Sequence, residues 1–309
     1  MKAIEIENLS KSFDGRWVLR NVSFSVDAGE VFGYLGPNGA GKTTTMRVLL
    51  GLLRPTSGTA LVKGADLHAN DEVRHSVGVL MENDGLYDRL SAWQNLDYYG
   101  RLYGVKDREE RTAELLETFG LSARRGDKVY TFSKGMRRKL GIARSIIHDP
   151  EILFLDEPTS GLDPEAQRMV RGSITDLSRR EGMTVMLSSH NLDEVEKICT
   201  RVAVIKNGEI RAYDTVENLR EGRGGHTLAV TLSKEADATA AIEVLRSSSS
   251  IIAVRQDGPR LTIAHGEESS SAILASIFRA GIGIEEASKT SRSLEDVYID
   301  LVKEQEVVG

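Results

Sequence analysis

The chain has 309 residues, which as a loose prior divides into about two domains of roughly 150 residues each. Its 40 lysine and arginine residues against 46 aspartate and glutamate residues give a net charge of −6, and this acidic balance argues against nucleic acid as the main ligand. The one cysteine, Cys199, excludes an internal disulfide, and no apolar stretch approaches the roughly 18 residues that a membrane span needs. Residues 1–10 also lack the apolar stretch of a signal peptide. We therefore expect a cytoplasmic protein that contacts a membrane only through a partner.

The first 60 residues predict strands and turns around one glycine-rich break. Alternating apolar residues predict strands over 3–9 and 17–26, and a short apolar run predicts a buried strand over 31–35. The glycines at 36–41 end that strand, and residues 42–53 have helical character. The predicted order is therefore strand, glycine loop, helix.

Residues 87–148 predict mainly helices, and from residue 151 short buried strands alternate with helices. Ser91 with Gln94 forms a capping box for one helix, and Ser133 caps a later one. Strands that alternate with helices imply a mostly parallel sheet. The strands are expected over 152–155, 184–187 and 202–205, with helices after Pro164 and over 192–199.

The C-terminal part predicts a second, smaller domain after a glycine-rich linker at 221–225. Its strands and helices follow a β-α-β-β-α-β order, which is the split ferredoxin-like arrangement of an α+β fold. We expect domains over 1–220 and 225–309. In the second domain the strands are expected over 227–232, 251–254, 260–264 and 282–286, and the helices over 236–245, 269–278 and 294–303.

Residues 36–43 match the phosphate-binding loop pattern G-x-x-x-x-G-K-[ST]. Glycines let several backbone N–H groups point at phosphate oxygens, and the helix that begins at Lys42 directs the positive end of its dipole at the same anion. Lys42 supplies a charge for the β- and γ-phosphates, and the Thr43 hydroxyl can ligate Mg²⁺. A glycine turn with a surface lysine is the plainer interpretation, which the position between a buried strand and a helix disfavours. The candidate nucleotide-binding residues are Gly36, Pro37, Asn38, Gly39, Ala40, Gly41, Lys42, Thr43 and Thr44.

A second chemical signal is the apolar strand at 152–155, which ends in two carboxylates, Asp156 and Glu157. A parallel strand delivers such residues at its carboxyl end, where ligands bind in open α/β sheets. Asp156 suits the Mg²⁺ shell, and Glu157 suits orienting or polarising an attacking water. A solvated acidic turn is the alternative for the pair taken alone, and the phosphate loop upstream favours the chemical roles.

Taken in order, these motifs resemble the ATP-binding subunits of ABC transporters over roughly residues 1–220. The phosphate loop matches that family's Walker A motif, and Asp156 with Glu157 matches its Walker B motif. The resemblance implies a P-loop ABC ATPase of the α/β class, with a mixed sheet and a helical subdomain over about 87–148. It also implies ATP and Mg²⁺ as cofactors, with Lys42 and Glu157 among the catalytic residues.

Further matches to the family lie at the expected places along the chain. They are Phe13 as the aromatic residue that stacks on adenine, Ser133, Lys134 and Gly135 within the signature at 132–136, Asp163 at the end of the D-loop at 160–163, and His190 as the switch histidine. Through the resemblance, His190 joins the catalytic set and the other residues join the nucleotide-binding set.

The chain departs from the family pattern at two motifs. Glu82 stands where the family has the Q-loop glutamine, and the signature has Lys134 for its first glycine and Met136 for its glutamine. Glu82 keeps an oxygen that can coordinate Mg²⁺ or water, and it adds negative charge beside Asp156. Lys134 adds a cation near the expected position of a γ-phosphate.

The resemblance also implies partners. Each ATP would be held by Walker A of one chain and by the signature of a second copy, so that ATP joins the two chains and hydrolysis releases them. The motion would pass to a separate membrane-spanning permease through Glu82 and the helical subdomain, which would place the chain at the inner face of the cell membrane. Residues 225–309 are similar to an accessory domain of one exporter subclass, which favours export over import.

Other classes of protein are considered as alternatives. An ABC ATPase acting in translation or DNA repair would usually carry two cassettes or a long coiled coil. A P-loop GTPase or nucleotide kinase would leave the signature unexplained, and the [NT]-K-x-D guanine motif is missing from the sequence. A non-catalytic binding module is disfavoured by Glu157 and His190. The basic residues between Lys134 and Arg144 are interpreted as a solvated helix face in preference to a nucleic-acid site.

Overall fold

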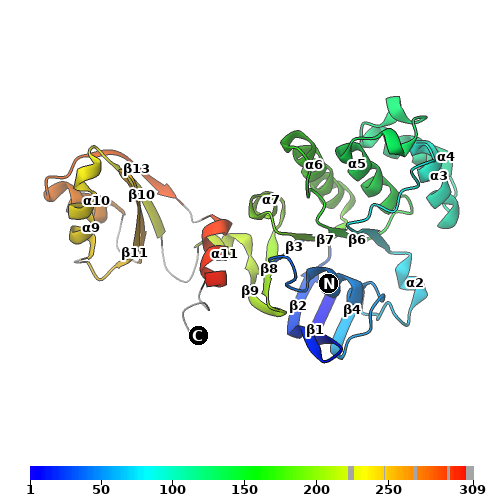
Figure 1. The fold of residues 1–309 in the computed structure, drawn as a ribbon, viewed down its shortest axis with the longest axis horizontal. Helices are drawn as coiled ribbons and strands as arrows, with labels where there is room; N and C mark the ends of the chain where they lie inside the picture. The colour runs from blue at the N-terminus through cyan, green and yellow to red at the C-terminus, as the bar shows by residue number, and fades with distance from the viewer. Residues whose placement is uncertain (222–225, 247, 267–269, 291–292, 304–309) are drawn as a thin grey trace. The chain divides into compact units, whose positions relative to one another are not determined.

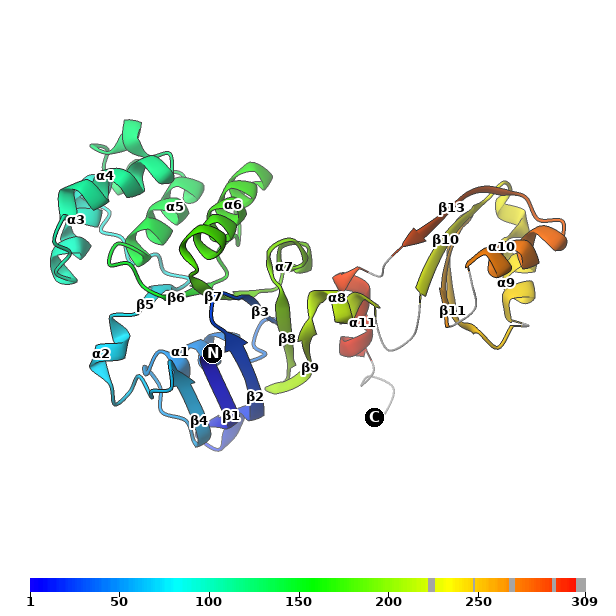
Figure 2. The same cartoon turned by 180° about the vertical axis from the view of Figure 1, so that it is seen from behind.

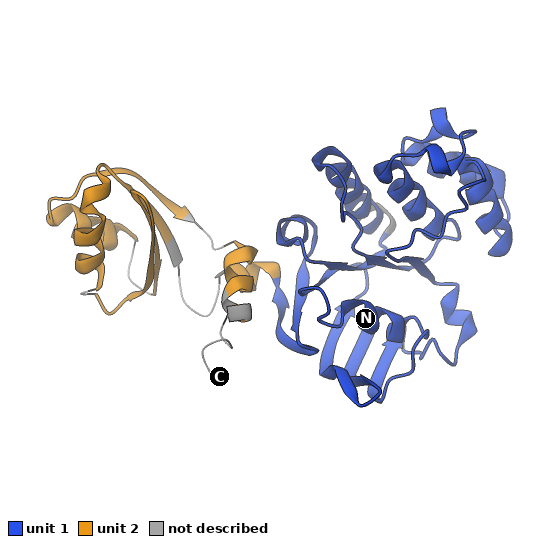
Figure 3. Cartoon of the chain, viewed as in Figure 1, with its two compact units in different colours: residues 1–215 blue, residues 216–309 orange. Residues whose placement is uncertain are grey.

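The computed structural model describes residues 1–221, 226–246, 248–266, 270–290 and 293–303. The chain forms two compact units, Met1–Thr215 and Val216–Gly309, here named unit 1 and unit 2 (Figure 3). The linker predicted at 221–225 lies outside the described residues apart from Glu221. The domain limits predicted from the sequence stay a prediction.

Unit 1 contains a six-stranded sheet and a three-stranded antiparallel sheet. The larger sheet has the order β5-β6-β7-β3-β8-β9, and its neighbours are parallel except for β8 with β9. The smaller sheet has the order β2-β1-β4. The mixed sheet predicted from the sequence is confirmed. The strands are β1 (Lys2–Phe13), β2 (Arg16–Asp27), β3 (Val31–Leu35), β4 (Ser57–Val62), β5 (Val77–Leu80), β6 (Ile152–Asp156), β7 (Thr184–Ser189), β8 (Arg201–Lys206) and β9 (Glu209–Thr215).

The six-stranded sheet is covered on both faces (Figures 1 and 2). Helices α5, α6 and α7 lie on one side, and α1 with the three-stranded sheet lies on the other. Phe32 and Tyr34 of β3 point to the same face of the six-stranded sheet, because alternate side chains of a strand share a face. Together with Phe154 of β6 they are fully buried against the three-stranded sheet. The helices of unit 1 are α1 (Lys42–Leu49), α2 (Asp71–Arg74), α3 (Ala92–Leu102), α4 (Arg108–Thr118), α5 (Lys134–Ser145), α6 (Pro164–Glu181) and α7 (Leu192–Ile198).

Helices α3, α4 and α5 form the predicted helical subdomain, and side-chain caps explain where two of them begin. Ser91 Oγ accepts a hydrogen bond from Gln94 N at 3.1 Å, and Gln94 Oε1 accepts one from Ser91 N at 2.9 Å. Ser133 Oγ accepts a hydrogen bond from Met136 N at 3.2 Å. These bonds satisfy N–H groups that a helix start leaves without an intrahelical partner. Both predicted caps are confirmed.

Unit 2 contains a four-stranded antiparallel sheet of order β11-β12-β10-β13. The chain passes through β10, α9, β11, β12, α10 and β13, which confirms the predicted ferredoxin-like α+β fold. Leu228, Val230 and Ile263 of the sheet pack with Ala241 and Ile277 of the helices. The elements are α8 (Val216–Glu221), β10 (His226–Leu232), α9 (Ala238–Arg246), β11 (Ile251–Asp257), β12 (Arg260–His265), α10 (Ser270–Arg279), β13 (Ile284–Thr290) and α11 (Leu294–Lys303).

Several short elements of the structure are not predicted from the sequence, and one helix is shorter than predicted. Strands β4, β5 and β9 are not predicted, because β4 begins with three exposed residues, β5 has only four residues and β9 is mostly half-buried. The helix predicted over 42–53 ends at Leu49, and Gly51 follows with a φ of 67°, a left-handed conformation that terminates helices.

Candidate functional site

The phosphate loop joins the buried strand β3 to helix α1. Gly41 is the N-cap of α1 with a φ of 112°, a conformation that L side chains rarely adopt. A Cβ atom on Gly36 would lie 2.4 Å from the carbonyl oxygen of Ile205, so only glycine fits there. These two glycines fix the loop whose N–H groups, together with the helix N-terminus, can cradle phosphate.

Lys42 is nearly buried at the start of α1. Its Nζ donates a hydrogen bond to Gly36 O at 2.7 Å and lies 3.3 Å from Glu157 Oε1. The ammonium group is thereby held between the phosphate loop and the carboxyl end of β6.

Asp156 is the last residue of β6 and is 2% exposed. Thr43 Oγ1 donates to Asp156 Oδ2 at 3.1 Å, and Ser188 Oγ donates to Asp156 Oδ1. Ser188 reaches this carboxylate because Asp156 and Ser188 pair in register across β6 and β7. A hydroxyl and a carboxylate oxygen are thus brought together beside the phosphate loop.

The donor set of Thr43 and Asp156 fits Mg²⁺, which prefers oxygen ligands and usually binds one or two carboxylates together with substrate phosphates. Within the described part of the chain, no group of three or more His, Cys, Asp or Glu side chains could hold a metal ion by itself. The ion would therefore depend on the phosphates of a bound nucleotide as well as on these two residues.

Glu157 follows Asp156 with a φ of 51°, in the left-handed region. Its backbone N–H donates to Ser188, at 3.2 Å to the carbonyl oxygen and 3.1 Å to Oγ. Nδ1 of His190, the residue that follows β7, lies 2.8 Å from Glu157 Oε2. One carboxylate is therefore in contact with both Lys42 and His190.

A cavity of about 670 Å³ lies at the carboxyl ends of these strands. The predicted residues that line it are Pro37, Asn38, Gly39, Gly41, Lys42, Thr43, Thr44, Glu82, Lys134, Asp156, Glu157 and His190. The remaining lining residues are Ser160 and Leu162 of the predicted D-loop, Arg137 and Arg138 of the basic residues of α5, and Val18 and Asp84, for which the sequence predicts no role. Val18 follows Trp17 on β2, and the Trp17 side chain is half-exposed.

Several predicted residues are not among those that line the cavity. These are Phe13, Gly36, Ala40, Ser133, Gly135 and Asp163. Phe13 ends β1 and is 42% exposed, and Lys11 Nζ lies 4.8 Å from the centre of its ring. Asp163 accepts a hydrogen bond from Ala166 N at 2.9 Å, so its carboxylate caps helix α6.

The signature residues lie at the start of helix α5. Ser133 is exposed, and its hydroxyl caps the helix. The Lys134 side chain reaches the D-loop, since a Cβ atom on Gly161 would lie 2.1 Å from Lys134 Nζ. The departure from glycine at position 134 thus places an ammonium group against the backbone of Gly161.

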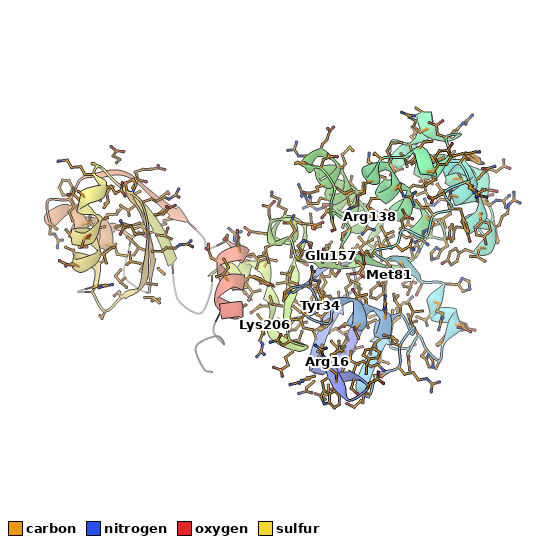
Figure 4. All side chains as sticks on the ribbon, viewed as in Figure 1. Arg16, Tyr34, Met81, Arg138, Glu157 and Lys206 are labelled. Atoms are coloured by element: carbon orange, nitrogen blue, oxygen red, sulfur yellow. The ribbon has the colours of Figure 1, made fainter. Side chains whose placement is uncertain are left out.

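The interpretation of the basic residues of α5 as a solvated face is wrong. Arg138 is 9% exposed, and its guanidinium donates to backbone carbonyls of the Walker B turn. Arg137 binds Asp84 at 2.9 Å and also contacts Asp88, while Arg144 donates to Val79 O at 2.6 Å. Figure 4 labels Arg138, Glu157 and Met81, which lie close together. A count of basic residues could not distinguish these anchors from surface charges, because burial depends on the neighbouring strands.

Comparison with known proteins adds a second line of evidence. The family model described as ABC transporter matches residues 19–160. The ABC transporter ATP-binding protein YhcH of Bacillus subtilis (strain 168) is 35% identical over 306 residues, which cover 97% of this chain and 96% of that protein. The chain belongs to the ABC transporter ATP-binding proteins.

Other ABC proteins agree with this assignment. The daunorubicin/doxorubicin resistance ATP-binding protein DrrA of Streptomyces peucetius is 36% identical over 305 residues, covering 97% of this chain and 92% of that protein. A solved structure of an ATP-binding subunit of an ABC transporter matches with a TM-score of 0.65 and 31% identity, covering 71% of this chain and 92% of that chain. The predicted family and the P-loop ABC ATPase fold are confirmed, and the chain is an ATPase. In the part of the chain that the structure describes, no helix combines the length and apolar character required to cross a bilayer.

The sequence motifs of this ABC protein do not identify the buried carboxylate of Glu194. Glu194 of α7 is fully buried, and its Oε2 accepts hydrogen bonds from Thr159 Oγ1 at 2.6 Å and Ser189 Oγ at 3.0 Å. Burial raises the pKa of Glu194, against the effect of these two donors. Thr159 precedes the D-loop and Ser189 precedes His190, so Glu194 ties these two segments together. Its position four residues after His190 was the available sequence signal.

Proposed function

We propose that this ABC protein is the ATP-hydrolysing subunit of an exporter and that Glu157 activates the water that attacks the γ-phosphate. The observation that carries the proposal is the location of one carboxylate between the phosphate-loop lysine and the switch histidine. Its oxygens lie 3.3 Å from Lys42 Nζ and 2.8 Å from His190 Nδ1. A general base must be held within hydrogen-bond reach of the proton that it abstracts, which here is a proton of the attacking water.

The other residues would bind and orient the nucleotide. Lys42 and the N–H groups of the loop would hold the β- and γ-phosphates, and the exposed ring of Phe13 would stack on adenine. His190 would fix the orientation of the Glu157 carboxylate through the contact at Oε2. Glu82, which lines the same cavity, would supply a further oxygen at the position of the Q-loop glutamine.

Thr43 and Asp156 would hold Mg²⁺, with Glu82 as a third candidate. When bound, the ion would neutralise part of the phosphate charge. Ser188 keeps one oxygen of Asp156 engaged, which orients the other oxygen toward Thr43.

ATP would join two copies of the chain. Ser133 stands exposed at the N-terminus of α5 and outside the wall of the cavity that contains Lys42, while most of the phosphate loop of the same chain lines that cavity. This separation supports a role for Ser133 and Gly135 on the γ-phosphate held by a second copy, and Lys134, which lies between them, would act at the same place. In this arrangement ATP stabilises the dimer, because it contacts both chains.

Export is supported by the drug-resistance name of the relative DrrA, which matches 97% of this chain. The substrate pathway would lie in a separate membrane-spanning permease, and the chain would be held at the membrane by that partner. The ferredoxin-like unit 2 would be an accessory domain of the exporter subunit.

The role of Glu157 is tested by Glu157→Gln. The amide still hydrogen-bonds water but is a poor base, so we expect hydrolysis at saturating MgATP to fall by about 100-fold or more with ATP affinity unchanged. The matched control is Glu151→Gln, which removes an exposed carboxylate just before β6. Near-normal turnover by Glu157→Gln would assign the base role to another group.

The composite site, formed by Walker A of one chain and the signature of a second copy, is tested in the Glu157→Gln variant, because slow hydrolysis keeps ATP bound. We expect Glu157→Gln to dimerise with MgATP and Glu157→Gln/Ser133→Arg to stay monomeric, measured by size exclusion with light scattering at equal nucleotide affinity. Ser122→Arg, an exposed change elsewhere in the helical subdomain, is the control and should leave the dimer intact. A dimer in the Ser133→Arg double variant would contradict the composite site.

A further inference from the structure

Arg138 occupies an unusual position for an arginine. It lies in the second turn of α5 with 9% of its surface exposed, and its guanidinium is directed at backbone carbonyl groups. Nε donates to Pro158 O at 2.8 Å, and Nη2 donates to both Asp156 O and Glu157 O at 2.6 Å. Nη1 donates to Met81 O at 3.1 Å. Three of the four acceptors belong to successive residues of the turn that leaves β6.

This geometry depends on the shape of the guanidinium group. Its five N–H donors are fixed in one plane, so the carbonyl groups that accept hydrogen bonds from them are held within a narrow range of positions. Arg138 therefore fixes the peptide groups on both sides of Glu157. The bond to Met81 O adds the residue that precedes Glu82, so one side chain anchors the Walker B turn and the Q-loop together.

The backbone of Glu157 needs such anchoring. Its φ of 51° lies in the left-handed region, which is unfavourable for a residue other than glycine. Ser188 accepts the bond from the N–H of Glu157, and Arg138 donates to its carbonyl oxygen. Both polar groups of the residue are thereby held, and the direction of its side chain toward Lys42 and His190 follows from that backbone conformation.

We propose that Arg138 is a positioning residue for the catalytic glutamate. It transmits the placement of helix α5, and hence of the signature at its N-terminus, to the Glu157 carboxylate. The inference rests on the proposed role of Glu157 as the base. The hydrogen bonds of the Arg138 guanidinium go to backbone carbonyl groups, so in this proposal Arg138 acts through the backbone of the turn.

The chain provides a matched control in Arg144. This arginine lies on the same helix and also anchors a backbone carbonyl, that of Val79 at 2.6 Å, and its guanidinium lies 5.0 Å from the centre of the Tyr99 ring. Its acceptor belongs to β5 and not to the Walker B turn. Variants of either arginine lose a hydrogen bond that anchors α5. Only variants of Arg138 also lose the hydrogen bonds that hold the backbone of Glu157.

The experiment compares Arg138→Lys and Arg144→Lys in the full chain. Lysine keeps the charge but cannot span four carbonyl groups, so we expect Arg138→Lys to lower kcat on the order of 10- to 100-fold, with KM and the Kd for MgATP within about two-fold of wild type. Arg144→Lys should change the melting temperature by a similar amount and leave kcat near wild type. Equal kcat values for the two variants would overturn the proposal. If Arg138→Lys does not fold, Arg138→Gln, which retains one amide donor group, carries the same comparison.

A double variant separates positioning from general damage. Because Arg138 acts through Glu157, adding Arg138→Lys to Glu157→Gln should lower the single-turnover rate by less than about two-fold further. If the losses of rate caused by the two substitutions instead multiply in full, Arg138 affects the rate independently of Glu157, and the proposal is overturned. Unchanged hydrolysis by Glu157→Gln alone would instead refute the role of Glu157 itself, so the two failures are distinguishable.

Discussion

The six-stranded sheet of unit 1 and the four-stranded sheet of unit 2 pair most of their strands in opposite ways, and this difference explains where the chemistry lies. In unit 1 the neighbouring strands β5, β6, β7 and β3 run parallel, so their carboxyl ends meet at one edge of the sheet. The segments that follow these strands carry Glu82, Glu157, His190 and the phosphate loop. In unit 2 all neighbouring strands are antiparallel, so successive strands end at opposite edges. Parallel pairing gathers polar residues from distant parts of the sequence, whereas antiparallel pairing distributes them.

The largest effect that would test this contrast is expected from Lys42→Ala. Removing the nearly buried ammonium group should weaken ATP binding by roughly 10- to 100-fold, because charge-assisted hydrogen bonds to phosphate contribute about 1.5–3 kcal/mol each. Isothermal titration with MgATP measures the loss. Lys63→Ala, which removes an exposed lysine that also pairs with a glutamate, is the control and should bind normally. An unchanged affinity of Lys42→Ala for MgATP would show that the phosphate loop does not bind the nucleotide.

A second test examines unit 2. Ile263 is fully buried in β12, so Ile263→Ala should destabilise this unit by about 2–5 kcal/mol. ATP affinity should be unchanged, since the candidate phosphate-contacting residues lie in unit 1. Circular dichroism during thermal unfolding measures the first quantity and nucleotide titration the second. The neighbouring exposed Thr262→Ala is the control. A loss of ATP affinity in Ile263→Ala alone would show that the units are not independent.

The smallest expected effect concerns Glu194 in unit 1. Because burial raises its pKa above the ordinary value of 4.5, the folded state keeps the proton to higher pH than the unfolded state. The stability from this group is therefore complete below pH 4.5 and decreases as the pH rises through the folded pKa. Glu194→Gln cannot lose a proton, so its stability relative to wild type should increase between pH 4 and pH 8 in urea titrations. Glu196→Gln is the control, and a pH-independent difference for Glu194→Gln would contradict the raised pKa.

The sequence alone predicts much of this molecule, for identifiable reasons. The phosphate loop and the pair Asp156-Glu157 are contiguous motifs, so their chemistry is visible without the fold. The β-α-β-β-α-β order of unit 2 is also visible, because its strands and helices have clear apolar patterns. The location of Arg138 could not be predicted in this way. The local sequence does not indicate that its guanidinium donates hydrogen bonds to carbonyl groups of β6 and of the Q-loop. Contacts of this kind depend on strand order, which the local pattern does not contain.

Glu82 and Lys134 illustrate the same limit. The sequence identifies both as departures from the family pattern, and the structure places both in the wall of one cavity. That the Lys134 ammonium group lies against Gly161 follows from the packing of α5 beside the D-loop, which motif spacing does not describe.

Both tryptophans of the chain, Trp17 on β2 and Trp93 on α3, lie in unit 1. Intrinsic tryptophan fluorescence therefore reports on the ATPase unit alone, and unfolding of unit 2 is spectrally silent in that signal. Trp17 is 46% exposed, so its emission is accessible to soluble quenchers. The wild-type chain thus carries a built-in optical reporter, which separates events in one unit from events in the other without any label.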